Sequence, residues 1–217
     1  MNYRNVFIFL LCSSMSLSLY PAQKTKKSVI EKAQEALDEA TPTNEEGIVI
    51  DLKKNGINAK NEFKQTVLDI AAQHPELFSA ELVADMIKSG ADIYNIDNHT
   101  YSTPLHQAAF YGNFSMMEVL IQHGAKINAL SAFQDTPLDN LLTGYQFYKK
   151  GELGLHSYTQ KTYTSKHAKP KYYDAALLLL KSDACVSEHT LELARKPYVN
   201  PTMTALIEEY SKTQPCK

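Results

Sequence analysis

The chain has 217 residues, of which 44% are hydrophobic and 21% are charged, and its formal net charge at pH 7 is −2. This length and composition are normal for a globular protein with one continuous core. The slightly acidic balance excludes a basic field over the whole surface, which nucleic-acid binding requires. We therefore expect no nucleic-acid partner.

Residues 1–22 have the composition of a secretory signal. Arg4 supplies the positive start, VFIFLL begins an apolar run, and small residues follow, so cleavage is expected after Ser18 or Ala22. Cys12 follows a leucine, which is too large for the usual lipoprotein cleavage position. We expect a soluble exported protein, periplasmic or secreted, with no membrane contact after signal cleavage. A lipid-anchored or uncleaved form is the alternative.

Residues 23–57 are expected to form a linker and an N-terminal capping pair of helices. Ser28 and Glu31 have the spacing of a capping box, and a helix is predicted from there to about Ala40. A second helix is predicted around 45–54. The first helix is rich in Lys and Glu, and it would supply the polar outer face that the end of a stacked array needs.

A pattern of 33 to 37 residues recurs through the middle of the chain. The segments TVLDIAA, TPLHQAA and TPLDNLL begin at Thr66, Thr103 and Thr136, and each threonine can cap a helix. The segments SGADI and HGAKIN place Gly90 and Gly124 34 residues apart. Helices of two turns are unstable alone, so this fixed period predicts stacked repeats. The asparagines eight residues before the threonines are Asn58, Asn95 and Asn128.

TPLHQAA at 103–109 resembles the T-P-L-H-x-A signature of the ankyrin repeat family, and an outer helix, FSMMEVLIQHGAKIN, follows in the expected order. The resemblance covers roughly 49–142 well and 172–212 more loosely. It implies an all-α solenoid of about five helix pairs with short β-hairpin tips, in which hairpins and inner helices line a concave groove. The family's tip glycine is absent here. Its places are taken by Lys64, Tyr101 and Gln134.

We expect three full repeats over 58–187, followed by closing helices and a tail over 188–217. The third repeat carries an insertion, 144–171, that is rich in lysine and tyrosine. Because long irregular loops are uncommon in compact domains, one interpretation is an arm that contacts an acidic protein partner. The alternative is a solvated loop without function.

The concave face that the resemblance implies is the predicted binding surface for another protein. Exposed aromatic side chains bury a large area at low entropic cost, so they are typical binding anchors. Packing of some of these side chains along the stack is the alternative. The predicted partner-binding residues are Phe63, Lys64, His74, His99, Tyr101, Phe110, Tyr111, Phe133, Gln134, Tyr145 and Tyr148.

Two cysteines, Cys185 and Cys216, remain after signal cleavage. An even pair in an oxidising compartment can form a disulfide, which would tie the C-terminal tail to the last full repeat. The alternative is one buried cysteine and one cysteine in a frayed tail.

No catalytic residue, metal site or cofactor is predicted. The histidines lack H-E-x-x-H and C-x-x-C contexts, and no G-x-S-x-G, Walker or G-x-G-x-x-G motif occurs. The resemblance implies that His106 is structural, bonding within and between repeats.

The leading hypothesis is a non-enzymatic, monomeric protein-binding module of the periplasm. It would act as an immunity protein that inhibits a toxic enzyme, or as an accessory to an exported enzyme. One alternative is a metal- or haem-binding protein, or an enzyme, that uses His156 and His167 of the insertion. Another is a secreted effector.

Overall fold

The computed structural model describes residues 27–40, 50–98, 101–152 and 171–216. The predicted signal segment and the central part of the insertion, 153–170, lie outside these ranges. Within them the regular secondary structure is helical, with one isolated β-bridge. The described helices are α1 (Val29–Ala40), α2 (Leu52–Asn55), α3 (Val67–Gln73), α4 (Ala80–Lys88), α5 (Pro104–Phe110), α6 (Phe114–Gln122), α7 (Pro137–Lys150), α8 (Tyr172–Lys181), α9 (Glu188–Ala194) and α10 (Pro201–Ser211).

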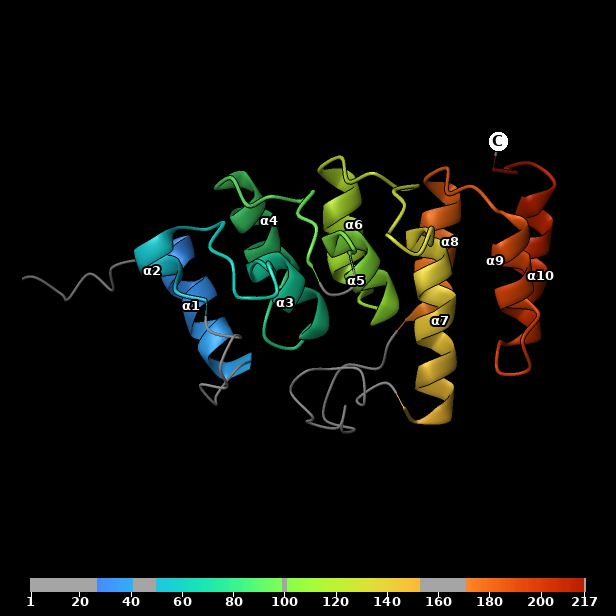
Figure 1. Ribbon diagram of the computed structural model, residues 1–217, viewed down its shortest axis with the longest axis horizontal. Helices are drawn as coiled ribbons and strands as arrows, with labels where there is room; N and C mark the ends of the chain where they lie inside the picture. The colour runs from blue at the N-terminus through green and yellow to red at the C-terminus, as the bar shows by residue number, and fades with distance from the viewer. Residues whose placement is uncertain (1–26, 41–49, 99–100, 153–170, 217) are drawn as a thin grey trace, which may run out of the picture.

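The helices stack as successive antiparallel pairs along one axis (Figure 1). Helices α3, α5, α7 and α9 form an inner row in which each contacts the next, and α4, α6, α8 and α10 form the outer row in the same way. Helix α1 closes the N-terminal end against α3 and α4. This arrangement confirms the predicted all-α solenoid. For the second capping helix, predicted around 45–54, residues 41–49 lie outside the described ranges. Residues 50 and 51 are not helical, and the four-residue helix α2 begins after its N-cap, Asp51.

Each inner helix begins with the same capping box, in which the N-cap backbone N–H donates to the side chain three residues later. The N–H of Thr66 donates to Asp69 Oδ2 at 2.7 Å, and the N–H of Thr103 donates to His106 Nδ1 at 3.2 Å. The third and fourth boxes pair Thr136 with Asp139 and Ser187 with Thr190. The local sequence therefore sets where every inner helix starts. Packing between rows stabilises the seven-residue helices α3, α5 and α9.

The tips that precede the inner helices are closed turns, which corrects the predicted β-hairpins. In the first and third tips, Asn61 N–H donates to Gln65 O at 3.1 Å and Ser131 N–H donates to Asp135 O at 2.9 Å. Neither tip continues into paired strands, because each loop leads at once into a helix.

The four non-glycine residues with positive φ in the described chain all stand at repeat turns. The three residues at the position of the missing tip glycine have φ of 56°, 52° and 64° for Lys64, Tyr101 and Gln134. Asp183, which stands where Gly90 and Gly124 stand in earlier repeats, has φ 65°. The turns therefore keep the left-handed geometry without glycine, at a cost of about 1 kcal/mol each.

Helix α7 is twice as long as α3 or α5, which corrects the predicted start of the insertion at residue 144. The helix continues through Gly144 to Lys150 and ends on Gly151, whose φ is 75°. Gly144 lies against the last turn of α5, where an added Cβ would overlap the carbonyl of Phe110. The absence of a side chain at residue 144 thus lets α7 pass α5 and extend beyond it.

Candidate binding surface

The most exposed predicted anchors lie on the tips. The Phe133 side chain is 70% exposed and that of Tyr101 is 50% exposed. Lys64 and Gln134 are also exposed, and Phe63 is partly buried. We call these five residues the tip surface: Phe63, Lys64, Tyr101, Phe133 and Gln134.

Hydrogen bonds to main-chain carbonyls of the first tip hold the first two tips together. Asn98 N–H donates to Phe63 O at 2.9 Å, and Asn95 Nδ2 donates to Lys64 O at 2.9 Å. Asn95 also reaches the buried carboxylate of Asp69 at 2.8 Å. The first tip is therefore held by its main-chain carbonyls, which leaves the Lys64 side chain at the surface.

The third tip is held from both neighbouring repeats. His106 is buried, and because its Nδ1 accepts from Thr103, its Nε2–H donates to Asp135 O at 3.1 Å. Burial lowers the pKa of His106, so the ring stays neutral in this arrangement. From the other side, His189 Nε2 lies 3.2 Å from Asp135 Oδ1. The structural assignment of His106 therefore agrees with its contacts.

Burial and a neighbouring acid affect the carboxylate of Asp135 at the base of the third tip. Partial burial raises the pKa of Asp135, and the carboxylate of Asp139 raises it further, while His189 opposes both effects. The Asp135 carboxylate is thus held close to a second acid and a histidine, directly beside the exposed Phe133 and Gln134 turn.

Tyr111 and Tyr145 are withdrawn from the predicted binding surface, because their side chains are only 4% and 8% exposed. They belong to an aromatic cluster that packs along the stack. The ring of Phe110 lies 5.2 Å from that of Tyr111, and the ring of Tyr145 lies 5.3 Å from that of Tyr172. For Tyr111 and Tyr145, the alternative interpretation therefore applies: these side chains pack along the stack and are not binding anchors.

The remaining predicted residues fall at the edge of the surface or outside the described ranges. Phe110 and His74 are partly buried, and His74 Nδ1 lies 3.3 Å from Glu76 Oε1. Tyr148 is 37% exposed and lies on the extension of α7, with its ring 5.7 Å from that of Tyr172. His99 lies outside the described residues.

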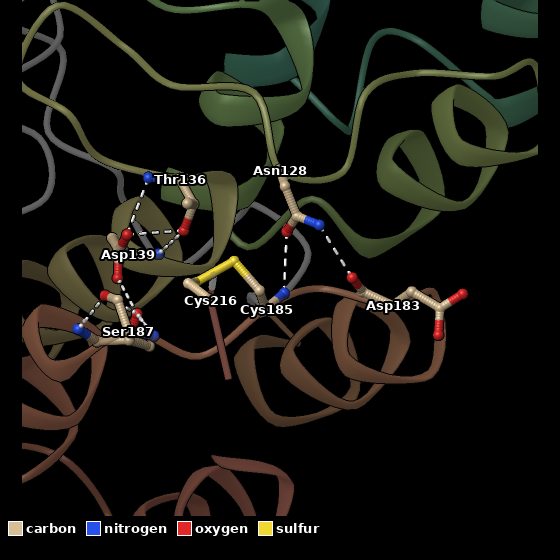
Figure 2. The surroundings of a disulfide bond; sticks show 8 residues. Asn128, Thr136, Asp139, Asp183, Cys185, Ser187 and Cys216 are labelled. Carbon is tan, nitrogen blue, oxygen red and sulfur yellow. Dashed lines mark hydrogen bonds between the residues drawn. A yellow bond between two sulfur atoms is a disulfide. The ribbon is translucent and has the colours of Figure 1, made fainter. Parts of the chain in front are cut away.

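The two cysteines of the C-terminal region are joined in a disulfide, Cys185–Cys216 (Figure 2). Beside it, Asn128 donates to Asp183 O at 3.0 Å and accepts from Cys185 N–H at 2.9 Å. Asn58 bonds Gly90 O and Asp92 N–H in the same way. These two asparagines connect one repeat to the turn of the next.

Asn95 departs from this pattern, although its spacing predicts the same contact. The hydroxyl of its neighbour Tyr94 donates to Gly124 O at 2.9 Å instead, which leaves Asn95 to hold the preceding tip.

The closing helices predicted over 188–217 are α9 and α10, and what sequence reasoning missed is the capping box at the start of α9. This box begins at Ser187, 51 residues after Thr136, which is the usual spacing of 33 plus an extra 18. The signal was the S-x-x-T at 187–190. It was masked by the insertion, which shifts the unit out of register with the earlier repeats.

Neither a metal site nor a membrane span is found in the described ranges. No group of three or more His, Cys, Asp or Glu side chains there is arranged to hold a metal ion. None of the described helices has the length and apolar composition needed to cross a bilayer.

Comparisons with known proteins agree with the geometry. Residues 37–131 match the family model for ankyrin repeats, in three copies. Over 108 residues the chain is 32% identical to "Ankyrin repeat and SOCS box protein 6" of Mus musculus. The match covers 49% of this chain and 26% of that protein, so the chain spans about a quarter of the length of the relative.

Proposed function

This chain carries ankyrin repeats, and from that premise we propose that it is a non-enzymatic module that binds another protein through the tip surface. Ankyrin repeats generally mediate protein–protein interaction. The observation that carries the proposal is the exposure of Tyr101 and Phe133, at 50% and 70%, on turns held by neighbouring repeats. Large aromatic side chains displayed on a preordered backbone lose little entropy on binding.

We further propose that the protein is exported and meets its partner in the periplasm. The composition of residues 1–22 supports export, and a disulfide is the type of crosslink that persists in an oxidising compartment. Two partners fit this setting. One is a toxic enzyme that the protein neutralises as an immunity factor, and the other is an exported enzyme that it assists.

The test uses the full chain as bait in a periplasmic extract, followed by affinity measurements with the purified partner. The double variant Tyr101→Ser/Phe133→Ser removes both anchors from exposed turns and should leave the fold intact. We expect it to weaken binding at least tenfold, on the order of the loss of one hot-spot residue. Tyr198→Ser is the matched control, because Tyr198 is 49% exposed but lies between α9 and α10.

Undiminished binding by the double variant would show that the tip surface is not the binding site. Recovery of the protein with its signal segment still attached in the cytoplasmic fraction would contradict the proposed export. The effect of this protein on the catalytic activity of the partner distinguishes the two partner types. An immunity factor lowers that activity, and an accessory maintains or raises it.

A further inference from the structure

The disulfide encloses the last helix pair of the solenoid and nothing else. Cys185 and Cys216 are separated by 31 residues, and α9 and α10 both lie between them (Figure 1). We call α9 and α10, with the loop between them, the terminal pair. The crosslink therefore joins the chain just before the terminal pair to the chain just after it.

The tail beyond α10 is fastened at the same place. Val186 N–H donates to Gln214 O at 2.8 Å, and Cys216 N–H donates to Val186 O at 3.2 Å. These bonds form an isolated parallel bridge between Val186 and Pro215. The disulfide and the bridge together close a ring around the terminal pair.

Within the described part of the chain, three polar contacts are found between the terminal pair and the preceding repeat. Thr190 Oγ1 donates to Asp139 Oδ1 at 2.6 Å, and Gln146 Nε2 donates to Leu193 O at 3.4 Å. His189 approaches Asp135 at the base of the third tip. Apolar packing adds to these contacts, through Leu193 and Ala194 of α9 and through Met203 and Ile207 of α10, which lies against α8.

In a stack of repeats each unit contacts only its neighbours, so the end unit can detach while the rest stays folded. A crosslink stabilises mainly by reducing the conformational freedom of the unfolded segment that it encloses. Here that segment is the terminal pair alone. The stabilising effect of the disulfide therefore acts on local detachment of the terminal pair.

We propose that Cys185–Cys216 is a redox-sensitive lock, and that its reduction lets the terminal pair detach while α3–α8 stay folded. The reductant is a dithiol of the thioredoxin class. One of its thiolates attacks a sulfur of the disulfide and forms a mixed disulfide, and the other protein sulfur leaves as a thiolate. The second thiol of the reductant, as its thiolate, then displaces the protein sulfur. The products are two protein thiols, after protonation, and the oxidised reductant.

Both cysteines are partly exposed, so a reductant can approach the bond. Detachment also removes His189 from Asp135, which frees one side of the third tip that carries Phe133. We therefore expect weaker partner binding after reduction, and this expectation rests on the proposed function. The lock itself does not depend on it.

Hydrogen exchange measured by mass spectrometry on the full chain tests the lock without any partner. The oxidised protein is compared with protein held under dithiothreitol and with the double variant Cys185→Ser/Cys216→Ser. For a loop of this length, we expect amides of α9 and α10 to exchange roughly a hundredfold to a thousandfold faster once the crosslink is absent. Amides of α3–α6 should exchange at the same rate in all three samples.

Equal exchange of α9 and α10 in oxidised and reduced protein would overturn the proposal. Equal acceleration in α3–α6 would overturn it too, because reduction would then loosen the whole fold. If the serine variant does not fold, the test uses the folded wild type before and after reduction with dithiothreitol. If the exchange result is as expected and a partner binds both redox forms equally, the lock stands and its connection to the tip surface fails.

Discussion

The hydroxyl of Thr190 donates to Oδ1 of Asp139 at 2.6 Å, across the boundary between the third repeat and the terminal pair. The other oxygen of this buried carboxylate accepts from the N–H and the hydroxyl of Thr136. Asp69 occupies the same position in the first repeat, but its Oδ1 is buried and has no hydrogen-bond partner in the described structure. Oδ1 of Asp69 therefore lacks the bond to the next repeat that Oδ1 of the equivalent Asp139 makes.

Thr190→Val should destabilise the protein, because it keeps the side-chain shape and removes both the donor to a buried carboxylate oxygen of Asp139 and the acceptor for the N–H of Ser187. We expect the free energy of unfolding to fall by about 1–3 kcal/mol, measured by urea denaturation. Thr202→Val, at an exposed position on α10, is the control and should change stability by less than about 0.5 kcal/mol. Equal stability of the two variants would mean that neither contact of the Thr190 hydroxyl contributes to stability.

Asp69 should make the protein less stable as the pH rises towards neutral. Burial raises the pKa of Asp69 from 3.8 to about 7, against the opposing hydrogen bonds from Thr66 and Asn95. Between these two values the folded protein keeps a proton that the unfolded chain has released. The unfolding free energy therefore decreases through this window and levels off above it.

The comparison with Asp69→Asn isolates this contribution, because the titration of His106 and of other groups is common to both proteins. Between pH 5 and pH 7.5 we expect the wild type to lose roughly 2–3 kcal/mol more than the variant. Thermal unfolding at a series of pH values measures the difference. Parallel stability curves would show that Asp69 does not titrate in this range.

Gly144→Ala should be severely destabilising, although alanine favours helices. The added Cβ would overlap the carbonyl oxygen of Phe110 and would lie 2.9 Å from the Cα of Phe110. The backbone of α5 or α7 would therefore have to move. That carbonyl also accepts from the Tyr172 hydroxyl at 2.9 Å. We expect a loss of about 2–4 kcal/mol in denaturant unfolding. The adjacent Thr143→Ala is the control, and a loss no larger than that of the control would refute the close contact.

Gln134→Gly should stabilise the third tip, because glycine adopts φ 64° without the cost that a side chain incurs. The expected gain in unfolding free energy is about 0.5–1 kcal/mol. Ala132→Gly, two residues earlier and outside the positive-φ positions, should instead lose about 0.5–1 kcal/mol. Changes of the same sign in both variants would contradict the conformation assigned to Gln134.

Local patterns in the sequence were enough to predict the repeats. A threonine followed three residues later by Asp or His caps a helix wherever it stands, and the spacing of Thr66, Thr103 and Thr136 shows how often the unit recurs. These signals act within a few residues, so they can be interpreted before any tertiary contact is known. The tip positions followed from the same spacing.

Only the tertiary structure decided which aromatic side chains reach the surface. Tyr111 and Tyr145 are buried because α7 passes close to α5 at Gly144 and meets Tyr172, which lies beyond the insertion. Phe133 stays exposed because its turn is held through the backbone rather than through its own side chain. The bond between Cys185 and Cys216 was likewise one of two possibilities until the terminal pair brought them together. Exposure and crosslinking depend on contacts between residues far apart in the chain, and local patterns do not specify them.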